Sequence, residues 1–421
     1  MARYIIQGGA ALKGETVVQG AKNSALALMA ASLLSDSSAV TIKNCPRLTD
    51  IDATIDILKH LGCDVVREDD IIDISPRHAH GCEVPDTLMR RLRSSTLFLG
   101  ALLAKTNKAR LSYPGGCELG PRPIDLHIAA FKKMGVTITE EYGYLNCVAE
   151  KGLKGADIVL SFPSVGATEN IMIAAAKASG VTTITNAARE PEIIDLALLL
   201  NMMGAKITGE GSSIITIEGV EKLHGAVMTC MPDRIAAITY LSAALATDGE
   251  VTLTGVVPDH MRFALSVLVS AGAAVTEYDS AVSVKRHGAF ILPVRTIKTM
   301  PYPGFPTDAQ AIVMALMTIA QGSSMFIETI FNSRYKIVSE LLRLGANISV
   351  EDRVAVVEGV QRLSGAYVSA TDLRGGAALV VAGLAAEGQT VIDNICHIER
   401  GYQNICGVMQ SLGANMRRAV G

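Results

Sequence analysis

The chain has 421 residues, of which 49% are hydrophobic and 19% charged, enough for two or three ordinary domains with large cores. The net charge of −3, the 4% share of aromatic residues and the absence of Trp argue against nucleic acid or an anionic membrane as partner. No apolar run reaches the roughly 18 residues needed to span a bilayer, and residues 1–8 read as a strand rather than a signal peptide.

The eight cysteines and eight histidines are scattered along the chain, with neither a CxxC pair nor an HExxH motif. This distribution predicts no metal site and no disulfide framework. It fits the reducing conditions of the cytoplasm, where we expect the protein to act.

A unit of about 70 residues occurs six times along the chain. Each copy has a helix that ends in an apolar residue followed by glycine, the usual C′ residue where a helix leads into a strand. A β-branched strand precedes each of these helices, and an Ala- and Leu-rich helix precedes each strand. The six glycines are Gly62, Gly135, Gly204, Gly272, Gly345 and Gly413.

The Ala- and Leu-rich helices are apolar nearly all round, as in 25–34 and 377–386, so we expect them to be buried. Each unit then reads strand, helix, strand, helix, strand, strand, and six units fit a closed arrangement. The predicted helix starts are Lys22, Arg93, Gly166, Asp233, Thr307 and Arg374.

The sixth unit is incomplete, because only eight residues follow Gly413. Residues 1–21 resemble the missing piece: their pattern of apolar residues and glycines matches that of 215–227. We infer that the N-terminal strand pairs into the C-terminal half. The predicted fold is therefore α/β, with two domains, 22–231 and 1–21 plus 232–421, each built from three βαβαββ units.

The starts of the buried helices are unexpectedly polar. A helix start presents free N–H groups and a positive dipole end, which suit phosphate or carboxylate. Ordinary capping explains Ser, Thr and Asp at these places but not repeated Lys and Arg, so we expect anion binding. The residues are Lys22, Asn23, Arg93, Ser94, Ser95, Ser164, Val165, Gly166, Asp233, Arg234, Thr307, Asp308, Asp372 and Arg374. A second set occupies equivalent repeat positions and favours one shared cleft: Arg47, Arg122, Arg189, Arg334 and Arg400.

The loop 113–123 is rich in Gly and Pro around Cys117 and is longer than its counterparts. An exposed thiol beside Arg122 has the cationic surroundings that lower a cysteine pKa and make it reactive. The other seven cysteines are predicted to be packing residues. Asp308, in the Pro-bounded turn 303–308, is either an N-cap or a base for a substrate hydroxyl, and its fixed setting favours the base.

The motifs as a set resemble the UDP-N-acetylglucosamine 1-carboxyvinyltransferase family from end to end. The motifs are Gly20-Ala-Lys-Asn23, Pro114-Gly-Gly-Cys117, Arg122-Pro-Ile-Asp-Leu-His127, Ser164-Val-Gly-Ala-Thr-Glu169, Ala188-Arg-Glu-Pro-Glu192, Pro232-Asp-Arg-Ile235, Tyr302-Pro-Gly-Phe-Pro-Thr-Asp308, Thr371-Asp-Leu-Arg374 and Arg400-Gly-Tyr402. The resemblance implies two inside-out α/β prism domains and transfer of the enolpyruvyl group of phosphoenolpyruvate (PEP) to the 3-hydroxyl of UDP-N-acetylglucosamine, the first committed step of peptidoglycan synthesis. It implies no metal ion and no organic cofactor.

The resemblance also implies roles for single residues. Lys22, Arg122 and Arg400 would hold the phosphate and carboxylate of PEP. Cys117 would be the general acid at C3, and Asp308 would deprotonate the sugar hydroxyl. The UDP-sugar contacts would be Asn23, Arg93, Arg122, Pro123, Ile124, Asp125, Leu126, Ser164, Val165, Gly166 and Ile330, with Arg334, Asp372 and Arg374 also at the substrates.

The chain departs from the family pattern at three acidic positions, where it has Ala236, Asn332 and Gln403. These departures keep open a second copy of the enzyme or a regulatory paralogue that binds the UDP-sugar without turnover. Another transferase of the same fold, 5-enolpyruvylshikimate-3-phosphate synthase, is a further alternative, disfavoured by the Cys117 loop. The sequence does not indicate an oligomeric state.

Overall fold

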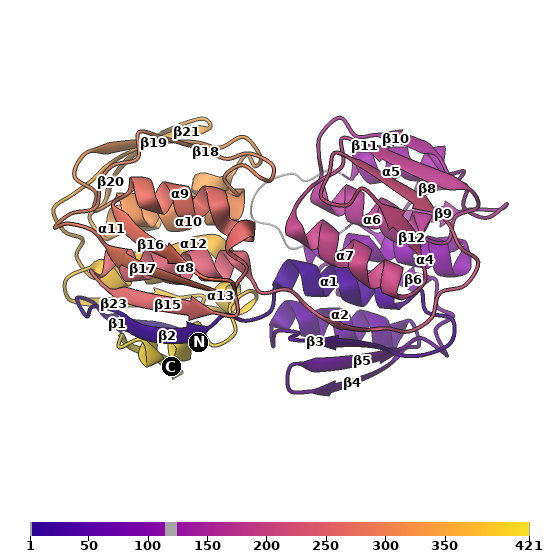
Figure 1. Cartoon of the computed structure of the whole chain (residues 1–421), viewed down its shortest axis with the longest axis horizontal. Coiled ribbons are helices and arrows are strands. Elements are labelled where there is room, and N and C mark those ends of the chain that lie inside the picture. Colours follow the sequence, from indigo (N-terminus) through magenta and orange to yellow (C-terminus); the bar gives the residue numbers. More distant parts are fainter. Residues whose placement is uncertain (1, 114–123, 421) are drawn as a thin grey trace. The chain divides into compact units, whose positions relative to one another are not determined.

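A computed structural model of the protein describes residues 2–113 and 124–420, which divide into two compact units (Figure 1). Among these residues, unit 1 contains 2–19 and 232–420, and unit 2 contains 20–113 and 124–231. The predicted domain boundary after residue 21 lies two residues beyond the observed end of the first segment, Gln19.

Each unit contains three four-stranded sheets with one common strand order. In every sheet the first pair of strands is parallel and the other two pairs are antiparallel. The sheets of unit 2 are β14 (Val227–Thr229), β3 (Val40–Lys43), β5 (Ile71–Ser75), β4 (Asp64–Glu68); β6 (Glu83–Val84), β7 (Lys108–Ser112), β9 (Tyr144–Val148), β8 (Thr137–Glu141); and β10 (Asp157–Val159), β11 (Val181–Thr185), β13 (Ile214–Glu218), β12 (Lys206–Thr208). Those of unit 1 are β2 (Lys13–Val17), β15 (Glu250–Thr254), β17 (Ala281–Arg286), β16 (Ala273–Glu277); β18 (Thr296–Lys298), β19 (Ser323–Ile327), β21 (Val354–Glu358), β20 (Asn347–Glu351); and β22 (Tyr367–Ser369), β23 (Gln389–Asp393), β1 (Ala2–Gln7), β24 (Asn415–Val420).

One helix packs against each sheet on its inner side, and neighbouring inner helices of a unit pack against one another (Figure 1). In unit 1 these helices are α8 (Arg234–Ala246), α10 (Thr307–Met317) and α12 (Leu373–Ala385); in unit 2 they are α1 (Lys22–Ser32), α4 (Phe98–Thr106) and α6 (Val165–Ala175). Helices inside and sheets outside are the predicted inside-out α/β prism. The remaining helices are α2 (Thr49–His60), α3 (Asp86–Met89), η1 (Arg93–Leu97), α5 (Asp125–Lys133), α7 (Pro191–Met202), η2 (Pro258–Met261), α9 (Arg262–Ser270), η3 (Arg334–Ile337), α11 (Val338–Arg343), α13 (Cys396–Glu399) and α14 (Ile405–Ser411).

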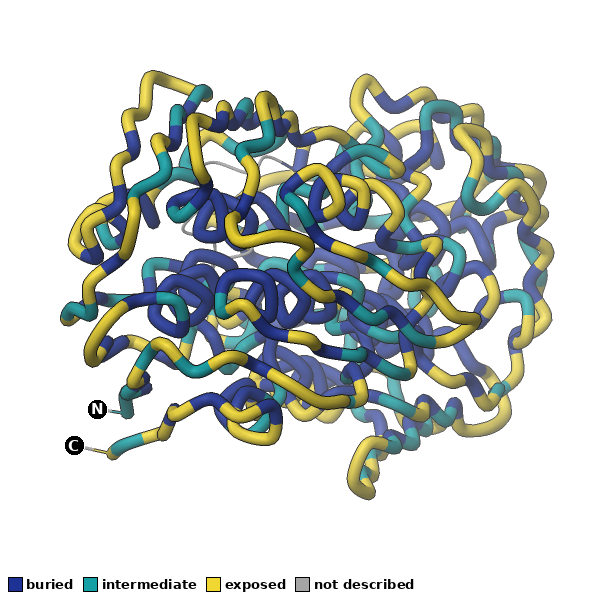
Figure 2. The backbone as a smooth tube through the Cα atoms, turned by 60° about the vertical axis from the view of Figure 1, so that its left-hand side comes forward, coloured by how far each residue is buried: buried dark blue, intermediate teal, exposed yellow. Residues whose placement is uncertain are grey.

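The inner helices are buried on every side, as their all-round apolar sequences predict (Figure 2). In α12 every residue from Arg374 to Leu384 is buried. The strands around them alternate buried residues with half-buried or exposed ones, as in β21, because one face of each sheet covers the helices and the other faces solvent. The apolar cores of the two units, one in each, follow from this layering.

The repeated glycines adopt the left-handed backbone conformation expected of a C′ residue. Their φ angles are 96° at Gly62, 88° at Gly135, 104° at Gly204, 94° at Gly272, 89° at Gly345 and 96° at Gly413. An L-residue with a side chain rarely adopts this conformation, which explains why each helix ends on glycine before the next strand.

The N-terminal strand completes the sixth unit, as predicted. β1 lies between β23 and β24 and is antiparallel to both; Ile6 faces Thr390 on one side and Met416 on the other. β2 then pairs in parallel with β15. β14 closes the first sheet of unit 2 against β3 in the same way, which explains its likeness to the N-terminal segment.

One predicted helix start is of a different kind. At Arg93 the chain forms the 3₁₀ helix η1, and α4 begins only at Phe98. The Ser95 hydroxyl donates to the carbonyls of Met89 and Leu92, and the Thr96 hydroxyl donates to that of Arg93. These side-chain bonds to the backbone compete with regular α-helical bonding.

Candidate active site

Lys22 is the first residue of α1 in unit 2. Its Nζ lies 3.2 Å from Oδ2 of Asp50, and the two side chains are 12% and 6% exposed. The N-cap residue of this helix, Ala21, contributes no side-chain cap. A largely buried cation at the positive end of a helix dipole is an unfavourable arrangement that Asp50 offsets, and it suits a site for an anion. Asp50 was not predicted; its place at the start of α2 is the only signal for it.

The helix starts fall into two groups. Ser164 caps α6 by accepting from Ala167 N, Asp233 caps α8, and Asp372 caps α12 by accepting from the N–H groups of Arg374 and Gly375. At these three starts ordinary capping explains the polar residue. No side-chain cap is present at α1, η1 or α10, the starts that carry Lys22, Arg93 and Asp308.

A buried hydrogen-bond network fixes His127 beside the predicted sugar-binding residues of unit 2. Asn170 Oδ1 accepts from Gly100 N at 2.7 Å, so its Nδ2 donates both to Thr96 O and to Nδ1 of His127, each at 2.9 Å. His127 is therefore neutral and carries its proton on Nε2. Burial, and secondly the charge of Arg93, lower the pKa of His127 to about 3.

The neutral state of His127 predicts a loss of stability in acid. Between pH 6.5 and pH 3 the unfolded chain binds a proton that the folded chain does not, so this contribution is complete above pH 6.5 and decreases as the pH falls. The expected loss is about 2 kcal/mol between pH 7 and pH 5. Urea unfolding at both pH values measures this loss of stability, with hydrogen exchange in α5 and α6 as the readout for unit 2.

His127→Gln should remove most of this pH dependence, whereas a change of the exposed His60 to Gln should leave it as in the wild type. Equal loss of stability in the wild type and His127→Gln between pH 7 and pH 5 would contradict the assignment.

In unit 1, Asp308 is held between two buried guanidinium groups. Its Oδ1 accepts from Arg334 Nη2 at 2.6 Å, and its Oδ2 accepts from Arg374 Nη2 at 3.0 Å and Nε at 3.2 Å. Arg334 and Arg374 are 2% and 3% exposed. Burial by itself would lower the pKa of Arg374, but the charges of Asp308, Tyr402 and Asp233 and the hydrogen bond to Tyr402 together outweigh burial, so the pKa is raised. Asp308 is not the N-cap of α10, which is Pro306.

A buried glutamate holds the neighbouring segments in place. Glu328 is 1% exposed and accepts from the hydroxyls of Thr299 and Thr307 at 3.0 and 2.9 Å. It also accepts from Ile330 N at 2.7 Å and Phe331 N at 3.1 Å. Glu328 thus joins the start of α10 to the loop that carries Ile330, a predicted sugar contact. Glu328 was not predicted; its place directly after a buried strand was its one signal in the sequence.

Arg400 follows α13 and is half-buried in unit 1. The Tyr402 hydroxyl lies 2.8 Å from Thr239 Oγ1 and accepts from Arg374 Nη1 at 3.3 Å. The segment of Arg400 is therefore joined through Tyr402 to the same arginine that contacts Asp308. Arg334, Asp372 and Arg374, all predicted site residues, also meet here: Arg334 Nη1 lies 4.0 Å from Asp372 Oδ1.

Three predicted site residues, Cys117, Arg122 and Pro123, lie outside the described residues. Ile124, which is buried, Asp125 and Leu126 lead into or form the first turn of α5. Two of the repeated arginines are exposed: Arg47, which pairs with Asp69, and Arg189.

Five of the other cysteines are buried: Cys45, Cys63, Cys147, Cys230 and Cys406. Burial raises the pKa of Cys45, Cys63 and Cys147 to about 12, so these thiols are unreactive near neutral pH. The prediction of a packing role is confirmed for these five. It is wrong for Cys396, which is exposed, while Cys82 is half-buried.

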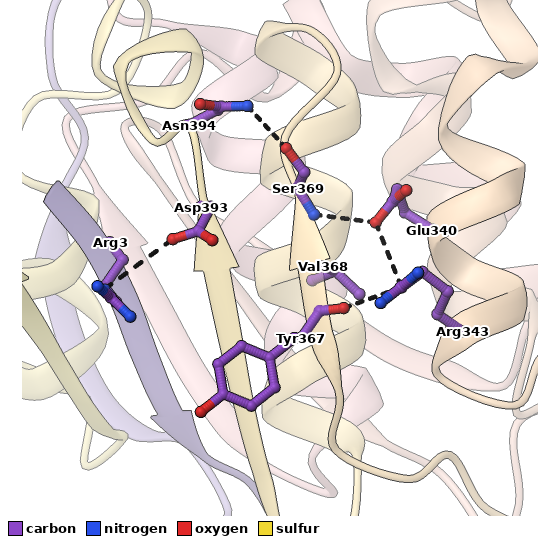
Figure 3. A pocket seen from close by; sticks show the side chains of 8 residues that line it. All are labelled: Arg3, Glu340, Arg343, Tyr367, Val368, Ser369, Asp393 and Asn394. Carbon is purple, nitrogen blue, oxygen red and sulfur yellow. Dashed lines mark hydrogen bonds and ion pairs between the residues drawn. The ribbon is translucent and has the colours of Figure 1, made fainter. Parts of the chain in front are cut away.

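A hollow of about 470 Å³ on unit 1 contains none of the predicted site residues (Figure 3). It lies along the edge strand β22, where Arg343 Nε donates to Tyr367 O and Ser369 N donates to Glu340, both at 2.9 Å. These contacts cover the free edge of the sheet, so the role of these residues is structural. Within residues 2–113 and 124–420, no His, Cys, Asp and Glu group of three or more is placed to hold a metal ion, and no helix is long and apolar enough to cross a membrane.

Comparison with known proteins agrees with this architecture. The family model for EPSP synthase (3-phosphoshikimate 1-carboxyvinyltransferase) matches residues 6–409. The solved structure of the enolpyruvyl transferase NikO from Streptomyces tendae has a TM-score of 0.89 at 26% identity and covers 100% of this chain and 99% of its own. An EPSP synthase from Acinetobacter baumannii, at 18% identity and a TM-score of 0.77 over 100% of both chains, shares the fold. The chain is thus of the enolpyruvyl transferase class.

Curated relatives narrow the class. UDP-N-acetylglucosamine 1-carboxyvinyltransferase 2 of Caldanaerobacter subterraneus subsp. tengcongensis is 49% identical over 421 residues, covering 99% of this chain and 100% of the relative. UDP-N-acetylglucosamine 1-carboxyvinyltransferase 1 of Symbiobacterium thermophilum is 47% identical, covering 99% and 95%. The chain belongs to the UDP-N-acetylglucosamine 1-carboxyvinyltransferase family.

Proposed function

We propose that the protein transfers the enolpyruvyl group of PEP to the 3-hydroxyl of UDP-N-acetylglucosamine and releases phosphate. The observation that carries this proposal is the full-length identity to transferases named for this reaction. The reaction makes a peptidoglycan precursor, so we place the protein in the cytoplasm, at the start of cell-wall synthesis, with consequences for cell shape and division.

The reaction is an addition followed by an elimination. The sugar oxygen adds to C2 of PEP while C3 gains a proton, which gives a tetrahedral intermediate that still carries phosphate. Loss of the C3 proton then re-forms the double bond as the C2–O bond to phosphate breaks. Both substrates are anionic, so fixed cations that orient them and stabilise the developing charge supply much of the catalysis.

We propose the following roles for the site residues of the two units. Lys22, at the uncapped start of α1, and Arg400 bind the anionic groups of PEP together with Arg122. Asp308 accepts the proton of the sugar hydroxyl; its two arginine partners favour the ionised form that a base needs at the outset. The proposed UDP-sugar contacts are Asn23, Arg93, 123–126, 164–166 and Ile330, with Arg334, Asp372 and Arg374 holding Asp308 and its surroundings.

Phosphate release with both substrates is the direct test. The wild type should release phosphate only when PEP and UDP-N-acetylglucosamine are both present, and Lys22→Ala or Arg400→Ala should lower kcat/KM at least about a hundredfold. Shikimate 3-phosphate in place of the UDP-sugar should give no product. Binding of the UDP-sugar without phosphate release would instead favour the regulatory paralogue.

The altered acidic positions are the reason to consider a regulatory paralogue. The surroundings of these positions argue against it. Ala236 is fully buried in α8, and its N–H is capped by Asp233. Asn332 accepts a hydrogen bond from Arg353, and Gln403 N donates to Gln19 at 2.6 Å. The Asp308, Arg334 and Arg374 cluster is complete without an acid at any of these positions.

We propose that Cys117 is the general acid at C3, that it can form an adduct with PEP, and that fosfomycin alkylates it. Its sulfur would attack the epoxide and open the ring, so Cys117 should gain the whole mass of the inhibitor. The sugar nucleotide should accelerate the reaction by completing the pocket. Peptide mass spectrometry with and without UDP-N-acetylglucosamine measures this, and Cys117→Asp should escape modification.

The exposed Cys396 is the internal control for this experiment. Modification of Cys396 to the same extent as Cys117, or indifference to the sugar nucleotide, would show that Cys117 has no special reactivity.

A further inference from the structure

The segment 400–403 of unit 1 is also held by hydrogen bonds other than those of the Tyr402 hydroxyl. On one side, Gly401 N and Tyr402 N donate to Ile398 O at 3.0 and 3.1 Å, which ties the segment to the end of α13. On the other side it meets the side chain of Gln19, a residue far away in the sequence and with no role so far.

Gln19 binds the backbone with both ends of its side-chain amide. Its Nε2 donates to Gly401 O at 3.0 Å, and its Oε1 accepts from Gln403 N at 2.6 Å. The carbonyl it binds belongs to the residue directly after Arg400. The two bonds therefore fix the peptide group between Gly401 and Tyr402 and the one between Tyr402 and Gln403, so the chain is held immediately after Arg400.

Gln19 is itself held firmly by its own backbone. It follows β2, which pairs along its length with β15, and Val18 N donates to Thr254 O at 3.0 Å. Gln19 O accepts from the N–H of Asp233 at 2.9 Å, beside the start of α8. The amide thus extends from a fixed point of the sheet to the segment of Arg400.

We propose that Gln19 is a positioning residue for Arg400 and acts in the binding of PEP; this inference rests on the proposed function. Only a side chain with a donor and an acceptor can make both bonds. Glutamate cannot donate to Gly401 O, and asparagine is shorter by one methylene group. Displacement of a charged group by about 1 Å is enough to weaken an oriented contact severely.

The variant that tests the proposal is Gln19→Met, because methionine fills a similar volume and makes neither hydrogen bond. The KM for PEP should rise about tenfold, which corresponds to the loss of about 1.4 kcal/mol, while the KM for UDP-N-acetylglucosamine stays within about twofold. In an Arg400→Ala background the same change should have no further effect, because Gln19 acts through Arg400.

Gln410→Met is the matched control. Gln410 also binds a backbone carbonyl of unit 1, that of Met416 at 2.6 Å, but outside the candidate site, so its kinetic constants should equal those of the wild type. Circular dichroism and the Tm establish whether each variant is folded. If Gln19→Met does not fold, the same kinetic constants are measured on Gln19→Ala.

The outcomes separate the two proposals. An unchanged KM for PEP, equal rises for both substrates, or losses that multiply in the Arg400→Ala background would overturn the role of Gln19 and leave the proposed function standing. Absence of phosphate release by the wild type would overturn the proposed function itself.

Discussion

Asp308→Ala is expected to cost the protein both stability and activity. The change leaves the guanidinium groups of Arg334 and Arg374, 2% and 3% exposed, without the carboxylate that compensates them. Breaking a buried ion pair by removing one partner costs about 3–5 kcal/mol, and the lower end applies because Asp308 is itself 29% exposed. Phosphate release should decrease at least about a hundredfold with the loss of a general base.

Urea unfolding and phosphate release, measured on the same preparations, test both parts. The control is Asp259→Ala, which removes a pair with Arg262 in which both side chains are more than two-thirds exposed. Its free energy of unfolding should change by at most about 1 kcal/mol. If Asp308→Ala is as stable as Asp259→Ala, the two arginines are not held by Asp308.

Most of the fold could be predicted from the sixfold sequence repeat. Gly62 and its five counterparts have a backbone conformation that almost only glycine adopts, so their spacing reports the helix ends directly. The pairing of β1 in unit 1 followed from the likeness between residues 1–21 and 215–227, because like sequences occupy like places in the two prisms. These signals depend on the backbone and on the repeat, not on long-range side-chain contacts.

The contacts of the candidate site could be predicted only in part. Ser164 and Asp372 suit either a cap or an anion-binding start, and sequence does not separate these roles when one side chain can serve both. The partners of Asp308 lie 26 and 66 residues away along the chain, and those of Glu328 come from separate segments, so only the folded chain reveals them. At Arg93, local side-chain bonds produced a 3₁₀ helix that apolar periodicity did not predict.

Deletion of residues 2–10, which removes β1 and leaves β2 and Gln19, is expected to unfold unit 1 before unit 2. β1 bridges β23 and β24, and its Tyr4 and Ile6 are 2% and 0% exposed. Loss of each buried side chain costs about 1.5–3 kcal/mol, and the broken strand pairing adds to this. The sum is comparable with the 5–15 kcal/mol that stabilises a typical domain.

Limited proteolysis with mass spectrometry should show the first cuts of the deletion variant within 232–420, while 20–113 and 124–231 stay protected, because no deleted residue belongs to unit 2. A synthetic peptide of residues 1–12 should restore protection by pairing with β23 and β24, as the missing strand does in the intact chain. Gln7→Ala, a change at an exposed residue of the same strand, should be cut as slowly as the wild type. First cuts within 20–113 would mean that β1 stabilises the other unit, contrary to the observed strand pairing.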